Sequence, residues 1–207
     1  MTEPEQIDRM GAGQSQNRKR LLLIALLAVF LSPVIGAWLW TPDSFRNRGE
    51  LIEPPRPLVS VPMVSPDGAL VELKTLLGKW TFVYFISGAC ESECLRTADA
   101  LTRVRLSQGK NARRLRVLAI VLSPAQLSAA SQLRLDMPET IVLGVSAEER
   151  QQLVSQFAHA SGAPAEGESR IYLVDPLGNL MMSYPADTDP SDLRKDIGRL
   201  LRASRIG

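Results

Sequence analysis

Two cysteines four positions apart are the first feature of this sequence that could do chemistry. Cys90 and Cys94 lie in the stretch "FISGACESEC" (residues 85–94) and are the only cysteines among the 207 residues. A pair this close can form a disulfide, work as a thiol–disulfide redox couple, or hold a soft metal ion such as Cu(I) between two thiolates. Each of these chemistries needs both sulfurs on one short, well-positioned stretch of chain.

The spacing of the pair favours a site at the start of a helix. Helical positions four apart share a face with Cβ atoms ~5–6 Å apart, whereas a disulfide needs Cβ atoms ~3.8 Å apart. We therefore expect local unwinding at Cys90, which we place at a helix N-terminus where the helix dipole lowers a thiol pKa. Glu91 and Glu93 act in the opposite direction, because nearby negative charge disfavours a thiolate and stabilises a bound cation. A static structural disulfide that closes a tiny loop remains an alternative.

An uncharged segment near the N-terminus predicts a membrane anchor. Residues 21–40, "LLLIALLAVFLSPVIGAWLW", are long enough to cross a bilayer core of ~30 Å. Arg18, Lys19 and Arg20 directly precede it and predict a cytoplasmic N-terminus. A cleaved signal peptide is the alternative, but the length of the run and its terminal tryptophans favour an uncleaved anchor. We expect a single-pass protein of a bacterial inner membrane, with both cysteines in the oxidising periplasm.

The rest of the chain divides into a tail, a tether and one globular domain. We expect residues 1–20 to form a disordered cytoplasmic tail. Residues 41–66 carry six prolines and predict a stiff, extended tether. The globular domain is expected over residues 67–207.

Within that domain, strand-like and helix-like patterns alternate. Apolar, β-branched runs predict buried strands, helical spacing of apolar residues predicts helices, and "DPLGN" predicts a turn at Asp175. Ser146 and Asp189 are expected to cap helices, with Pro190 at a first helical position. The predicted strands cover a short stretch within 66–73, residues 79–86, 115–123 and 139–145, and two stretches within 169–185. The predicted helices cover 94–108, 124–135, 146–161 and 189–204. This order predicts an α/β domain with a mixed sheet flanked by helices, and the cysteines after the first buried strand point to a thioredoxin-like fold.

Composition and motifs exclude several classes of function. The formal net charge is +2, and no concentrated basic face is visible, so we expect no nucleic-acid partner. The sequence has no P-loop, no GxSxG and no paired-histidine metal motif. No hydrolase or nucleotide-dependent activity is therefore expected, and thiol–disulfide oxidoreductase activity remains open.

Three stretches carry a resemblance to a known family. "GKWTFVYFISGACESEC", "LRVLAIVLSP" and "YLVDPLGNLMMSYPADTDPSDLRKDIGRLL" resemble the Sco/SenC family of cytochrome c oxidase assembly proteins. The resemblance implies a membrane anchor, a thioredoxin-like domain, and a CxxxC pair that binds copper together with one distant histidine. Here "GESR" (residues 167–170) stands where the family has that histidine, and Leu95 replaces the proline after the second cysteine.

The resemblance implies a role in the assembly of a haem–copper oxidase. Its partners would be an oxidase subunit or the subunit's assembly factors, and Cys90 and Cys94 would act as a dithiol couple or transiently hold Cu(I). A copper chaperone and a non-catalytic scaffold with a structural disulfide are the alternatives. His159, the single histidine, is expected near a helix C-terminus, where its protonated form interacts favourably with the helix dipole, rather than as a metal ligand. At least one of Met181 and Met182 is expected in the core.

Overall fold

The computed structural model describes residues 7–39, 47–158, 169–204 and 206. The chain forms two compact units, Met1–Arg46 and Asn47–Gly207.

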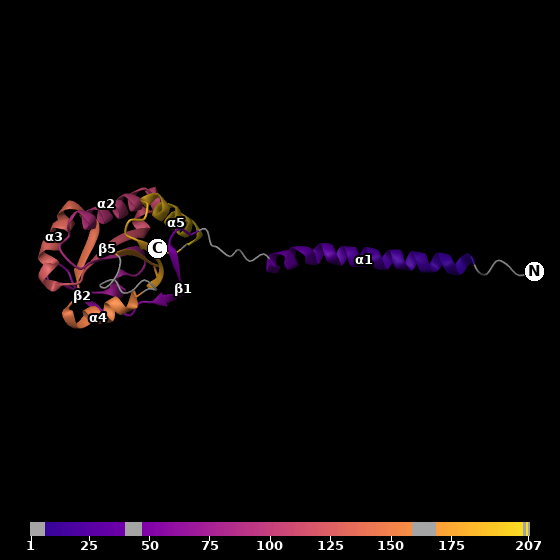
Figure 1. The fold of residues 1–207 in the computed structure, drawn as a ribbon, viewed down its shortest axis with the longest axis horizontal. Coiled ribbons are helices and arrows are strands. Elements are labelled where there is room, and N and C mark those ends of the chain that lie inside the picture. The colour runs from indigo at the N-terminus through magenta and orange to yellow at the C-terminus, as the bar shows by residue number, and fades with distance from the viewer. Residues whose placement is uncertain (1–6, 40–46, 159–168, 205, 207) are drawn as a thin grey trace, which may run out of the picture. The chain divides into compact units, whose positions relative to one another are not determined.

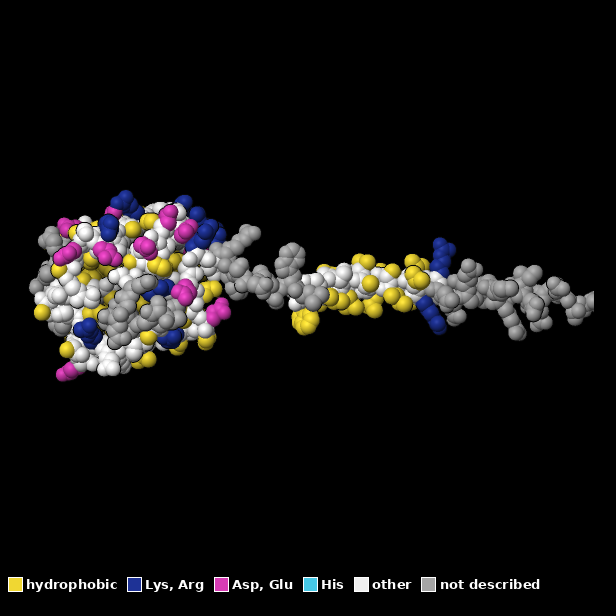
Figure 2. Space-filling model, viewed as in Figure 1, with side chains coloured by type: hydrophobic (Ala, Val, Ile, Leu, Met, Phe, Trp, Pro, Cys, Tyr) yellow, Lys and Arg dark blue, Asp and Glu magenta, His cyan; other side chains and the backbone are white. Residues whose placement is uncertain are grey.

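The described part of the first unit is one long helix, α1 (Ile7–Leu39). Residues Arg18–Gly36 are long and apolar enough to cross a membrane, and Figure 2 shows apolar side chains along this helix with basic ones at its N-terminal side. The expectation of a disordered tail over residues 1–20 is wrong from Ile7 onward. Gln, Arg and Lys in this stretch are good helix formers, and adding residues to an existing helix costs far less than nucleating one. Trp40, the last residue of the predicted anchor, lies outside the described residues.

From residue 80 onward, the second unit follows the predicted order of strands and helices. Its strands are β1 (Glu50–Pro57), β2 (Pro62–Val64), β3 (Leu70–Glu72), β4 (Trp80–Ile86), β5 (Leu115–Val121), β6 (Thr140–Gly144), β7 (Arg170–Val174) and β8 (Asn179–Pro185). Its α-helices are α2 (Ser92–Leu106), α3 (Leu127–Asp136), α4 (Ala147–Gln156) and α5 (Pro190–Ala203), with short 3-10 turns η1 (Leu73–Leu76), η2 (Gly109–Arg114) and η3 (Pro124–Gln126). The caps are confirmed: the Glu149 amide donates to Ser146 Oγ, and the Ser191 amide donates to Asp189 Oδ1.

The described strands form one mixed sheet in the order β1-β8-β7-β4-β5-β6-β2-β3. β4 is parallel to β5, and β5 is parallel to β6, whereas β7 pairs antiparallel with both β4 and β8. The turn from β7 to β8 is the one predicted, since Asp175 Oδ1 accepts the amides of Leu177 and Asn179 and Gly178 has a φ of +91°. β4 therefore lies in the middle of the sheet, and the cysteine stretch follows its carboxyl end.

Helices cover both faces of this sheet, as Figure 1 shows. One core contains buried residues of α2, α3 and α5, among them Leu101, Leu133 and Ile197. The other contains Leu153 and Phe157 at α4. There Phe85, Phe157 and Tyr172 meet edge to face, with ring centroids 5.0–5.9 Å apart. The thioredoxin-like architecture expected from the sequence is thus confirmed.

The predicted tether is wrong for most of its length, because the globular unit begins at Asn47 rather than residue 67. β1 adds antiparallel to β8 at the edge of the sheet, although it carries Pro54, Pro55 and Pro57. Proline cannot donate to a neighbouring strand, but an edge strand has one side free of that demand. The register shifts between Leu51 and Arg56, so the prolines fall at and beside an irregular stretch of the ladder.

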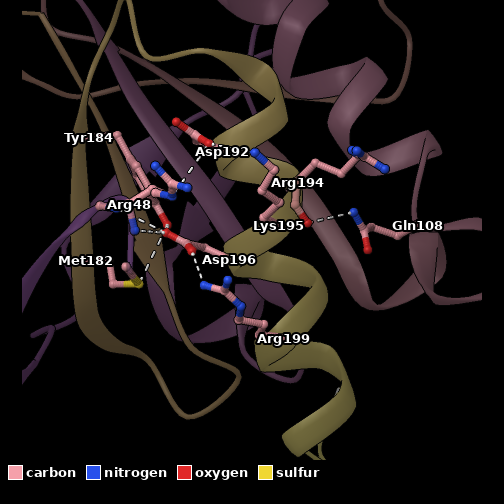
Figure 3. A network of polar contacts seen from close by, with 10 residues as sticks. Arg48, Gln108, Met182, Tyr184, Asp192, Arg194, Lys195, Asp196 and Arg199 are labelled. Carbon is pink, nitrogen blue, oxygen red and sulfur yellow. Dashed lines mark hydrogen bonds and ion pairs between the residues drawn. The ribbon is translucent and has the colours of Figure 1, made fainter. Parts of the chain in front are cut away.

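A buried carboxylate holds the segment that leads into β1 (Figure 3). Asp196 on α5 is 1% exposed, and its Oδ2 accepts the amides of Arg48 at 2.7 Å and Gly49 at 3.0 Å. The Tyr184 hydroxyl lies 3.4 Å from the same oxygen, and Arg199 donates to Oδ1 at 3.2 Å. Position 49 has room only for glycine, since a Cβ there would lie 2.3 Å from the Tyr184 ring.

Candidate functional site

Cys90 and Cys94 form a disulfide at the mouth of α2, and their Cα atoms are 5.1 Å apart. The helix begins at Ser92, so Cys94 is in its first turn, while Cys90 precedes it. The expected unwinding at Cys90 is therefore present. The Leu95 amide donates to the Glu91 carbonyl as the first helical bond, and the Glu91 amide donates to the Ala89 carbonyl.

The sulfur pair lies between the core and the surface. Both cysteines are half-buried and pack against the core that α2 and α5 share. Glu91, Ser92 and Glu93 between them are exposed. Glu91 occupies the N-cap position of α2 without accepting a side-chain cap bond. The first turn of the helix is thus free of a side-chain cap, and two carboxylates flank it.

A hollow of about 320 Å³ opens beside the disulfide. We call it the disulfide hollow; it is lined by the end of β4 and the loop after it (Tyr84–Ala89), by Glu91–Cys94 and Thr97, and by Ser169, Arg170 and Ala186. Cys94 lines it directly, and Ala89 and Glu91 on either side of Cys90 line it too. A partner that enters this space reaches the sulfur pair.

Sequence reasoning missed Tyr84, which contributes to the same hollow. Tyr84 is 4% exposed, and its hydroxyl is buried without a hydrogen-bond partner among the described residues. Burial raises the pKa of this phenol above its ordinary value, so the group remains a hydroxyl donor at neutral pH. Its place in an apolar run signals a buried strand, and nothing in that run distinguishes it from a core residue.

The remaining candidate residues either have other partners in the described chain or lie outside it. His159 lies outside the described residues. Met182 is 1% exposed in the core, as expected for one of the two methionines, and Met181 packs against the same core. Arg170, where the resemblance would place a histidine, donates to Glu50 at 2.7 Å and to Ser183 at 2.9 Å. Its guanidinium is therefore committed to the neighbouring strands.

The described site offers copper the two sulfurs of Cys90 and Cys94. No group of three or more His, Cys, Asp or Glu side chains arranged for a metal occurs within the described ranges. Two thiolates suit Cu(I), which accepts two sulfur ligands, and they become available only when the Cys90–Cys94 bond is reduced. A site with a third, nitrogen ligand does not fit the described part of the chain.

Comparisons with solved structures agree with this architecture. Copper-bound ScoI of Arabidopsis thaliana is 20% identical, covers 70% of this chain and 98% of its own, and has a TM-score of 0.60. BsSco, a member of the Sco family of cytochrome c oxidase assembly proteins with a disulfide switch, is 17% identical over 73% of this chain and 96% of its own, with a TM-score of 0.56. A thiol:disulfide interchange protein from Bacteroides sp. is 14% identical over 73% and 91%, with a TM-score of 0.54. No curated protein sequence matches the chain significantly.

The expected resemblance to Sco proteins is thus confirmed in the fold, at identities too low to transfer an activity. A family model described as "Transmembrane-like, thioredoxin-like, C-terminal domain" matches residues 80–204, which is more than half of the chain. The match begins at the first residue of β4 and ends just after α5, so it includes both cysteines. The protein therefore belongs to the family of transmembrane-like, thioredoxin-like C-terminal domains, with a Sco-like fold.

Proposed function

We propose that this protein is a membrane-anchored thiol–disulfide couple that assists the assembly of a haem–copper oxidase. The observation that carries the proposal is the Cys90–Cys94 disulfide, half-buried at the start of α2 and open to a hollow. A bond placed where a partner can reach it suits exchange better than a bond sealed in the core. The oxidase as client is supported by the fold shared with the Sco proteins.

The chemistry is a two-step exchange. In the reduced protein, the Cys90 thiolate attacks one sulfur of a partner disulfide; a Cys90–partner bond forms, and the second partner sulfur leaves as a thiolate that takes up a proton. Cys94, having lost its proton to solvent, attacks the Cys90 sulfur, closes the Cys90–Cys94 bond and releases the first partner thiol. The partner gains two electrons and the protein loses two. A dithiol reductase renews the reduced protein.

The acidic residues at the pair set the direction of this exchange. Glu91 and Glu93 disfavour thiolates, so they destabilise the reduced protein relative to its disulfide. A couple of this kind donates electrons and is a poor oxidant. We therefore infer that this protein reduces a disulfide of its client. The thiols formed on the client then serve in assembly of the oxidase centre.

The reduction potential of the full-length protein tests this proposal against a structural disulfide. We expect a potential above about −300 mV, measured by equilibration with glutathione or dithiothreitol buffers, because structural disulfides of secreted proteins lie below that value. A lower potential would contradict the redox function and favour a scaffold with a structural disulfide.

An anaerobic titration of the reduced protein with Cu(I), against a competing chelator, tests the copper alternative. Tight binding that is lost in both Cys90→Ser and Cys94→Ser would favour a copper carrier.

A further inference from the structure

The disulfide hollow is one end of a longer groove. Two more hollows adjoin it, one lined by Arg96, Ala100 and Thr188 among others, the second by Pro185 and Ser169. All three share Glu93 and Ala186. We call the whole the acidic groove; it runs from the sulfur pair between the first turns of α2 and the residues 185–190 that join β8 to α5.

The charge along this groove is mostly negative. Glu91, Glu93 and Asp187 are exposed on its walls, and none of them has an ion pair within the described part of the chain. Arg96 is the exposed cation among its lining residues. Arg170 lines the groove as well, but its guanidinium is paired with Glu50. Three exposed carboxylates against one exposed cation attract a ligand that carries positive charge.

A second, independent observation points to a ligand in the groove. The buried Tyr84 hydroxyl lacks a partner, and Tyr84 lines the groove beside Cys94. A buried donor left without an acceptor costs free energy in the unbound protein. A docked main-chain carbonyl would supply that acceptor. An extended peptide brings such carbonyls at regular intervals, whereas a small thiol such as glutathione brings net negative charge.

We propose that the acidic groove binds an extended, basic polypeptide segment of the client and delivers that segment's disulfide to Cys90 and Cys94. Glu93 and Asp187 select lysine and arginine side chains next to the reacting cysteine, and the Tyr84 hydroxyl donates to the segment's main chain. This rests on the proposed thiol–disulfide function, but the docking itself needs no redox chemistry.

Three peptide probes test the proposal on full-length reduced protein in neutral detergent. Each ten-residue probe has a central cysteine joined to 2-nitro-5-thiobenzoate, flanked by lysines, serines or glutamates. Attack on the probe disulfide releases the coloured thiolate, and closure of the Cys90–Cys94 bond releases the peptide thiol. At low ionic strength we expect the lysine probe to react about tenfold faster than the glutamate probe, from two or three exposed charge pairs. The preference should shrink at 0.5 M salt.

Variants separate docking from thiol chemistry. Asp187→Asn lies away from the disulfide hollow, so it should lower the lysine preference about two- to threefold and leave the serine probe unchanged. Glu148→Gln removes the same charge from exposed α4 on the opposite face of the sheet and should change neither rate. Tyr84→Phe should slow every peptide probe about two- to tenfold without lowering the unfolding midpoint, since its hydroxyl satisfies nothing in the unbound protein.

The outcomes distinguish failure of the groove from failure of the function. Equal rates for the three probes, or a preference unchanged in Asp187→Asn, would overturn the groove. If no probe reacts while dithiothreitol still releases the dye, the redox function fails. Docking is then judged by the fluorescence anisotropy of a cysteine-free lysine peptide on the oxidised protein, where binding equal to that of the glutamate peptide overturns the groove as well.

Discussion

The two cysteines differ in how the backbone holds them. Cys94 is fixed in the first turn of α2, whereas Cys90 precedes the N-cap and carries no helical constraint. The sulfur that attacks the partner must move toward it and must then be attacked by the second cysteine. Cys90, outside the helix, has more freedom for this movement than Cys94. We therefore assign the attack to Cys90 and the resolving step to Cys94.

Replacing the resolving sulfur should trap the mixed intermediate. Reduced Cys94→Ser, mixed with the lysine probe, should hold the peptide on Cys90 as a stable adduct, because no second thiol is present to release it. Intact mass spectrometry would detect the added peptide mass. Cys90→Ser is the matched control and should form much less adduct. A stable adduct on Cys94 alone would reverse the assignment.

At the scale of elements, the carboxylate of Asp196 joins α5 to the start of the globular unit. It accepts two amides from residues 48 and 49 and sits beside Tyr184, which is 1% exposed (Figure 3). The pKa of the Tyr184 phenol lies above its ordinary value. Burial is the larger cause, and the nearby Asp196 carboxylate is the second. The entry segment is thus held by hydrogen bonds to one buried carboxylate on α5.

Asp196→Asn should destabilise the protein by about 1.5–3 kcal/mol, the range for hydrogen bonds to a charged group. The amide keeps the shape but loses the charge and one accepting oxygen. Urea denaturation of the full chain measures the loss. Asp192→Asn, whose more exposed carboxylate pairs with Arg48 and Lys195, is the control and should cost less than about 1 kcal/mol. Equal losses in the two variants would contradict a special role for the buried carboxylate.

The sequence predicts the elements of this domain well where local patterns decide, and less well where tertiary pairing decides. From β4 to α5 the apolar periodicity and the caps Ser146 and Asp189 locate the described elements to within a few residues. β1 could not be predicted in this way. Its prolines are typical of an extended tether, and only its position at the edge of the sheet, which depends on pairing with β8, allows them in a strand. The groove could not be predicted either, because Tyr84 and Asp187 lie far apart in the sequence and line adjoining hollows only once the chain is folded.

At the scale of the whole molecule, the apolar helix and its basic flank predict the orientation that the proposed function needs. In bacterial spheroplasts, externally added proteinase K should digest the globular unit and spare an epitope placed before Met1. Loss of the epitope before any protease is added would identify a cleaved signal peptide. A globular unit that resists the protease in intact spheroplasts, but is digested after lysis, would contradict the periplasmic location.

The pairing of β1 with β8 also limits where this protein can work. A tether over residues 41–66 would reach roughly 90 Å when fully extended, but the seven residues 40–46 that remain between Leu39 and Asn47 reach at most about 25 Å. With the helix in the bilayer, as proposed, Asn47 stays within that reach of Leu39, so the globular unit works near the membrane. A client must therefore present its disulfide close to the membrane surface, which suits an integral membrane complex and rules against capture of freely diffusing proteins at a distance.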